Sequence, residues 1–292
     1  VADPWLEETK KQVKENPKTN PKLITFLEGY EQFNRSGDKY IIASFDYDSI
    51  VRIGWTENSY PELQQQINKN RPALELIISS LDTAGWSIPT QNPTMNSYVM
   101  NFLKVQTMVK YLVVMGKQAE ARNDIETALQ CYLSSVQLGH NLMQDSPFMI
   151  QYLIGIACTQ IPAKPLNYLI KSGKLSDAQL QKIAEESYRF HKSYNSGLNA
   201  ARGEYSSILY TVNHLSDYRK LIEENTSRNR LTSLLVQINI FFNKGKIIRE
   251  IDSMYRDCFH YQEQFHNILG HQAMGFLYSN MKPLLSAFPL FP

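Results

Sequence analysis

Apolar residues recur at helical spacing along most of the chain. The clearest stripe is formed by Ile125, Ala128, Tyr132, Val136 and Met143, which fall on one face of a helix. Breakers and capping residues divide the sequence into successive helices. The ranges predicted as helical are 5–16, 22–36, 62–84 (ending at Gly85), 95–122, 124–143, a helix from Pro147 that breaks near Ile161, 176–194, 198–215, 229–243, 246–269 and 271–281.

This pattern predicts an all-α fold, built as an irregular array of helices. Asn-Gly and Asp-Gly, the strongest short hairpin signals, are missing from the sequence. Residues 40–48, YIIASFDYD, are β-branched and aromatic enough for a minor strand, but no partner strand is signalled. We expect residues 1–60 to form a helical segment packed on a main α-helical domain of residues 61–292, or the whole chain to be one continuous domain.

One helix junction is specified in detail by local residues. Gly173 suits the position just after a helix end. Ser176 and Gln179 have the spacing of a capping box, and Leu175 and Leu180 that of a hydrophobic staple. We therefore predict that a helix starts at Ser176.

Prolines mark the preceding helix. Ser146 and Pro147 together resemble an N-cap followed by the first helical residue. Pro162 and Pro165 predict a kink or break near Ile161, because proline lacks the amide hydrogen that a helix interior needs.

Residues 121–153 resemble one unit of the tetratricopeptide family, a 34-residue helix pair with small residues at the helix contact. Ala128 lies at the family's small position, Tyr132 at its aromatic position and Ser135 at its second small position. Gly116 lies where the first helix has its close-approach glycine. The resemblance implies that helices 95–122 and 124–143 pack antiparallel with Gly116 facing Ala128.

The resemblance is confined to this single hairpin. His140 replaces the family's final proline, and no second copy follows at a 34-residue offset. A solenoid needs about three stacked repeats, so we expect one tetratricopeptide-like hairpin inside a larger helical domain. An ordinary core helix with Ala and Tyr at i, i+4 remains the alternative.

A second resemblance covers residues 71–210. The segments that carry it are, in order, RPALELI, GWSIP, DIETALQCYLSSVQLGHNL, MIQYLIGIAC, LSDAQLQ and ARGEYS. Their order is similar to that of a family of uncharacterised, exported bacterial helical proteins. The resemblance implies an all-helical fold and an extracytoplasmic location, periplasmic or envelope-associated, and no activity.

Composition argues against two classes of function. The 30 basic and 28 acidic side chains leave a formal net charge of only +2, whereas nucleic-acid-binding proteins carry a basic patch or stripe. No window holds the 18 or so uninterrupted apolar residues of a transmembrane helix. We expect neither nucleic-acid binding nor a transmembrane span. The chain begins with Val1 rather than Met, and removal of a signal peptide or trimming of the sequence would each explain this.

The cysteines show no metal-binding or redox spacing. Cys131 and Cys158 lie in apolar helical patterns and Cys258 lies in a polar region. We expect Cys131 and Cys158 to be buried free thiols, with a disulfide between them as the alternative.

The densest group of potential metal ligands lies in residues 257–271. Glu263 and His266 form one E-x-x-H pair, whereas di-iron bundles use two such pairs and further glutamates. His260 precedes His266 by six residues, which places it about 120° away around a helix. We expect these to be ordinary polar residues of a helix face, with no metal or other cofactor bound.

Glu204 is the remaining candidate for a metal or active site. It follows Arg202 and Gly203, where a helical glycine indicates close packing. We expect a buried Glu204 that pairs with an arginine of a neighbouring helix.

No motif of a nucleophile or phosphate loop is present, so no catalytic residue is assigned. The leading hypothesis is a non-enzymatic helical binding or scaffold protein with a protein partner, as a subunit or accessory factor of a larger envelope assembly. The alternative is an enzyme or metal-binding protein whose site is assembled from distant residues. The uncharged segment SAFPLFP, residues 286–292, is expected to dock on the helical body or on a partner chain.

Overall fold

Every regular element that the structure describes is an α-helix, which confirms the all-α prediction. The computed structural model describes residues 3–16, 20–35, 47–56, 60–81, 86, 88, 100–144, 146, 148–194, 197–213, 248–249 and 252–253. The helices are α1 (Pro4–Glu15), α2 (Pro21–Arg35), α4 (Tyr47–Ile53), α5 (Pro61–Ser80), α6 (Phe102–Ala121), α7 (Ile125–Met143), α8 (Met149–Gln160), α9 (Ala163–Lys171), α10 (Asp177–Tyr194) and α11 (Gly197–Asn213).

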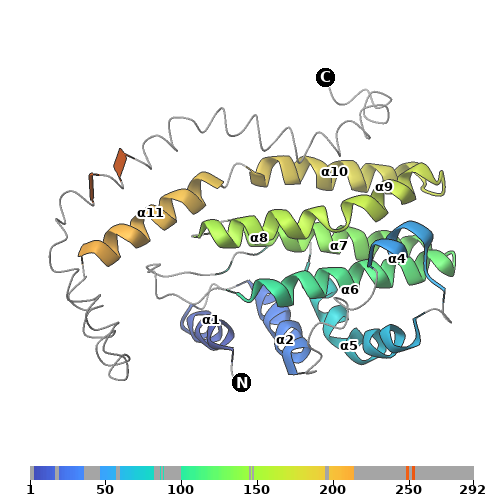
Figure 1. The fold of residues 1–292 in the computed structure, drawn as a ribbon, viewed down its shortest axis with the longest axis horizontal. Helices are drawn as coiled ribbons and strands as arrows, with labels where there is room; N and C mark the ends of the chain where they lie inside the picture. Colours follow the sequence, from blue (N-terminus) through green and yellow to red (C-terminus); the bar gives the residue numbers. More distant parts are fainter. Residues whose placement is uncertain are drawn as a thin grey trace.

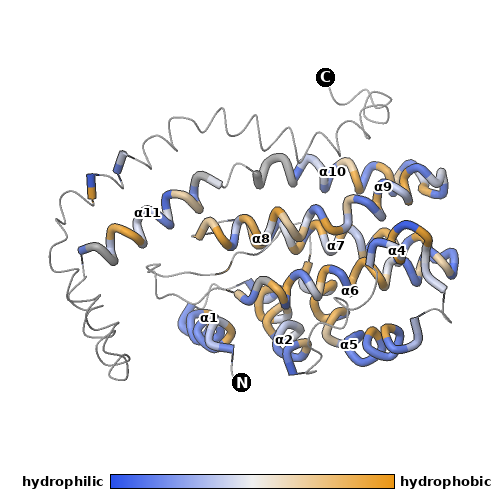
Figure 2. Tube along the Cα trace, in the orientation of Figure 1, coloured by the Kyte–Doolittle hydropathy of each residue, from blue (hydrophilic) through white to orange (hydrophobic). Residues whose placement is uncertain are grey.

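The helices are arranged around α7, which packs on α6 at one side and on α8 at the other (Figure 1). Helices α2 and α5 pack together and adjoin α6, and α1 lies against α2. On the far side, α10 lies on α7 and α11 on α8. Hydrophobic residues are concentrated along α6, α7 and α8, while α1 and much of α5 are hydrophilic (Figure 2). Three helices thus form the centre of the molecule.

The largest cluster of buried side chains extends from Trp5 in α1 to Cys158 in α8. It draws residues from both sides of position 60, and the domain boundary expected there stays a prediction. At one edge of this core, the Asp3 carboxylate accepts hydrogen bonds from the Tyr30 hydroxyl at 3.1 Å and from Lys104 Nζ at 3.2 Å. This carboxylate therefore ties α1, α2 and α6 together.

Helices α7 and α8 cross in backbone contact through two glycines. A Cβ atom on Gly139 would lie 2.6 Å from the Gly155 carbonyl oxygen, and one on Gly155 would lie 2.7 Å from the Gly139 carbonyl oxygen. Either distance is too short for a side chain. The pair of glycines therefore sets how closely the two central helices approach.

The contact between α6 and α7 differs from the one we expected. The helices run antiparallel through the short turn at residues 122–124, but Gly116 faces Tyr132 rather than Ala128. A Cβ on Gly116 would lie 2.4 Å from Tyr132 Cε1. The aromatic ring fills the space that the missing side chain leaves, and the likeness to the tetratricopeptide unit itself stays a prediction.

The start of α6 and the end of α5 were predicted incorrectly. Helix α6 begins at Phe102, not at residue 95, because the Asn101 side chain accepts from the Lys104 amide at 3.2 Å and caps the helix there. Helix α5 ends at Ser80, before Gly85, and the Trp86 indole donates to the Ser80 carbonyl at 3.2 Å. That bond satisfies one of the terminal carbonyl groups.

Helix α8 begins at Met149, two residues after the predicted start. The Ser146 hydroxyl donates to the Phe148 carbonyl at 2.8 Å and so does not cap the helix. The cap comes from α11, where the Glu204 carboxylate accepts from the Met149 amide at 2.8 Å. A carboxylate at this position also interacts favourably with the helix dipole.

Three other local signals are confirmed. Helix α8 ends at Gln160 and α9 begins at Ala163, so the chain breaks beside Pro162 as predicted. Gly173 adopts φ +68°. The Ser176 amide donates to Gln179 Oε1 at 2.9 Å and the Gln179 amide to Ser176 Oγ at 3.4 Å, which completes the capping box.

Some predictions fall partly or wholly outside the described residues. Of the ambiguous stretch 40–48, only Tyr47 and Asp48 are described, and both belong to α4, a helix that the sequence pattern did not reveal. The predicted helices 229–243 and 271–281 and the segment 286–292 lie outside, as does most of 246–269.

Candidate functional site

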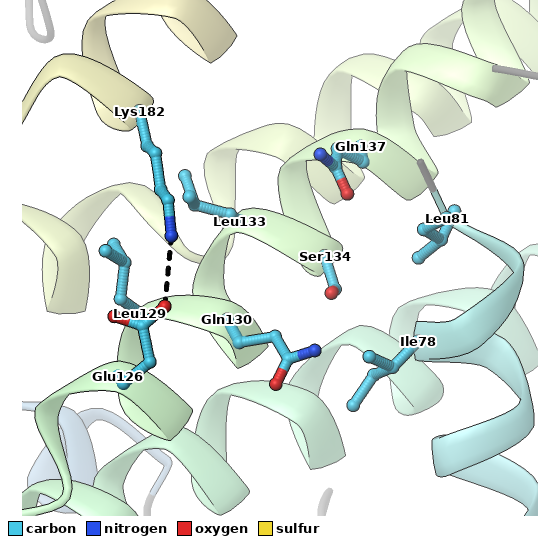
Figure 3. A pocket seen from close by; sticks show the side chains of 9 residues that line it. All are labelled: Ile78, Leu81, Glu126, Leu129, Gln130, Leu133, Ser134, Gln137 and Lys182. Carbon is cyan, nitrogen blue, oxygen red and sulfur yellow. Dashed lines mark hydrogen bonds and ion pairs between the residues drawn. The ribbon is translucent and has the colours of Figure 1, made fainter. Parts of the chain in front are cut away.

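A groove of about 400 Å³ lies between α5, α7 and α10. It is lined by Ile78, Leu81, Glu126, Leu129, Gln130, Leu133, Ser134, Gln137 and Lys182. Helix α7 supplies most of these side chains, α5 supplies the aliphatic wall opposite, and α10 supplies Lys182 (Figure 3). A concave surface with apolar walls and a few polar groups is the usual form of a binding site.

Three uncharged polar residues follow one face of α7 through the groove. Gln130, Ser134 and Gln137 are spaced i, i+4, i+7, so they lie in one row along the helix. Figure 3 shows them across from Ile78 of α5 and from Leu81, the residue that follows this helix. The row therefore presents amide and hydroxyl groups beside aliphatic side chains.

One end of the groove is bridged by an ion pair. Lys182 Nζ lies 3.0 Å from Glu126 Oε1, and Gln179 Nε2 donates to Glu126 Oε2 at 2.8 Å. The Gln179 hydrogen bond, followed by that of Lys182, lowers the pKa of the Glu126 carboxyl. Both partners of the ion pair are exposed, so the pair adds little stability but leaves this end without net charge.

The other end of the groove is supported by a polar cluster between α7 and α10. Gln137 Nε2 donates to Glu186 Oε1 at 3.0 Å, and Arg189 Nη1 donates to the same oxygen at 2.6 Å. Glu186 is only 5% exposed. Because the amide nitrogen of Gln137 is bonded to Glu186, its oxygen is turned toward the Ser134 side of the groove (Figure 3).

His140 belongs to the same cluster. Its Nδ1 lies 3.7 Å from Glu186 Oε2, but Glu186 is already paired with Arg189. Burial, and then the Arg189 guanidinium, lower the pKa of His140 to about 4. The imidazole is therefore neutral at pH 7.

The two described cysteines are buried free thiols, as expected, and the alternative of a disulfide between Cys131 and Cys158 is wrong. Burial raises the pKa of each thiol to about 12. A thiol is a nucleophile only as the thiolate, so neither residue has the properties of a catalytic cysteine. Cys258 lies outside the described residues.

Of the candidate ligands from the sequence, only Glu204 is described, and it does not line the groove. Glu204 is half-buried and caps α8, and within the described part of the chain no arginine pairs with it. The expected pair with an arginine stays a prediction. His260, Glu263 and His266 lie outside the described residues. Within the residues described, no three His, Cys, Asp or Glu side chains gather as metal ligands would.

None of the comparisons with known protein families, curated proteins and solved structures finds a match for this chain. Across the described residues, no helix combines the length and apolar character needed to cross a membrane. The groove was not anticipated from the sequence. Its only local signal was the row Gln130, Ser134 and Gln137, which places three uncharged polar residues on one face of α7.

Proposed function

We propose that the protein is a non-enzymatic helical binding protein that holds a segment of a partner protein in the groove between α5, α7 and α10. The observation that carries the proposal is the lining of the groove, where the half-buried Ile78 of α5 lies across from the uncharged polar row of α7. Apolar surface supplies affinity and a few fixed polar groups supply orientation. Recognition of a peptide uses this combination.

Two finer statements belong to the same proposal. Membership of a larger envelope assembly and an extracytoplasmic location are supported by the resemblance of residues 71–210 to exported helical proteins. The alternative, an enzyme or metal-binding protein, depends on residues 260–266 and on Glu204, whose carboxylate is engaged by the Met149 amide at 2.8 Å. That engagement favours a structural role for Glu204.

The proposal is tested by measuring how tightly a partner binds to a variant in which a larger side chain fills the groove. Gln130 is exposed and lines the groove, so Gln130→Trp places an indole there without disturbing the core. Gln181 is exposed, does not line the groove, and donates to Glu185 at 3.2 Å. Gln181→Trp is therefore the matched control.

Partners are first captured from extracts of the native organism with wild-type protein, then purified and titrated against the three proteins by calorimetry. We expect Gln130→Trp to weaken binding by about tenfold or more, because filling the groove removes about 1.4 kcal/mol or more of binding free energy. The Gln181→Trp protein is expected to bind as wild type does. Equal affinities for all three proteins would rule out the groove as the binding site.

A further inference from the structure

The polar row of α7 has the length of a short extended peptide. Gln130 and Gln137 are seven residues apart, which corresponds to about 10 Å along a helix. About three residues of extended chain, at roughly 3.3 Å each, cover the same distance. On the basis of the proposed function, we infer that the groove binds an extended, uncharged segment of a partner protein, with about three residues aligned along Gln130, Ser134 and Gln137.

The charges of the groove exclude a charged segment. Lys182 and Glu126 are paired with each other at 3.0 Å, and Gln179 donates to Glu126 as well. The other described lining residues are uncharged. A charged side chain placed among them would lose hydration without gaining a counter-charge, which is unfavourable.

The polar row favours an extended backbone over a helix. The Gln137 amide is held by its 3.0 Å bond to Glu186, which leaves the amide oxygen as a fixed acceptor. An extended segment has amide groups that need partners when they leave water, whereas a helix already bonds its own. Alternate side chains of the segment then pack on the half-buried Ile78 of α5 and on the exposed edges of Leu81 and Leu133.

A random heptapeptide phage library panned on the immobilised full-length chain tests the chemistry of the segment. Clones are recovered on wild type and counter-selected on Gln130→Trp, so that only groove-dependent clones remain. We expect these clones to be uncharged at three or more consecutive positions and rich in aliphatic or aromatic residues. Groove-dependent clones dominated by Lys, Arg, Asp or Glu would overturn the inference while leaving the proposed function in place.

The backbone contact is tested with a synthetic peptide of the most enriched clone, measured by fluorescence anisotropy. We expect Gln137→Leu to weaken binding by about fivefold, the effect of losing one hydrogen bond, with Gln181→Leu as the unaffected control. In a second series, each amide of the peptide in turn is N-methylated and the peptides are measured on wild-type protein, so that the result does not depend on how a variant folds. We expect N-methylation of at least one amide to abolish binding. Tolerance of N-methylation at every position would overturn the extended-backbone inference.

A different pair of results would remove the proposed function instead. Those results are clones that bind Gln130→Trp as well as wild type, or no enrichment on wild type at all. The panning therefore separates the two cases: charged clones that need the groove contradict only the inference, whereas clones that do not need the groove contradict the proposed function.

Discussion

His140 is a buried imidazole whose surroundings favour its neutral form. It lies in the contact between α7 and α10, with Glu186 Oε2 at 3.7 Å from Nδ1 and Arg189 bonded to the same carboxylate at 2.6 Å. Because the guanidinium already balances the Glu186 charge, protonation of the imidazole would bring a second cation into a buried site. The cluster that orients Gln137 in the groove is therefore sensitive to acid.

We predict that stability falls as the pH is lowered from about 6.5 to about 4. In the folded state the pKa of His140 is about 4, so between these values the unfolded chain binds a proton that the folded protein does not, and unfolding is favoured. The fall is about 1.4 kcal/mol per pH unit, roughly 3 kcal/mol in total. Urea unfolding of wild type and His140→Gln at pH 7, 6, 5 and 4.5 measures it.

Comparing wild type with His140→Gln separates the effect of His140 on stability from the effects of other acid-sensitive groups. Glu31, Asp124 and Glu126 also have lowered pKa values, so protonating them removes stability as the pH falls. They do so equally in both proteins. The free energy of unfolding of His140→Gln is expected to fall less steeply, and parallel curves would show that His140 is not held neutral.

At the scale of the helices, the Gly139 and Gly155 contact decides the spacing of α7 and α8. Two effects of Gly155→Ala oppose each other. Helix propensity favours alanine by about 1 kcal/mol, but the new Cβ would lie 2.5 Å from Met143 Cγ and 2.7 Å from the Gly139 carbonyl oxygen. The methionine can move, whereas the backbone oxygen moves only with its helix.

We therefore predict that Gly155→Ala destabilises the protein by about 1–3 kcal/mol, the usual cost of overpacking. Gln160→Ala, at the exposed end of the same helix, is expected to change stability by less than about 0.5 kcal/mol. Urea midpoints at pH 7 measure both changes. A Gly155→Ala protein at least as stable as wild type would mean that α7 and α8 separate without cost.

Local signals of the sequence predicted the elements whose ends are fixed by nearby residues. The start of α10 is one example, because Ser176 and Gln179 bond within a single turn. The start of α8 was wrong because its cap, Glu204, is 55 residues distant. The groove and the Gly139 contact escaped prediction for the same reason, since each depends on helices that only the fold brings together.

At the scale of the whole molecule, the buried apolar clusters of the described residues all lie within α1 to α11 and the segments between them. The three clusters of buried apolar residues extend from Trp5 to Ala200. Beyond α11, the Tyr205 hydroxyl donates a hydrogen bond to the Asp252 carboxylate. A single hydrogen bond contributes only about 1 kcal/mol, which is small beside the free energy of burying these clusters.

We predict that a chain ending at Asn213 folds on its own. Its 213 residues contain all three clusters and the whole lining of the groove, and a chain of this length buries enough surface to be stable. Circular dichroism should show a helical spectrum and a cooperative urea transition, and the groove should bind the same peptides as the full chain. A shortened chain that unfolds without cooperativity would show that residues after 213 complete the core, and that the groove needs them for its shape.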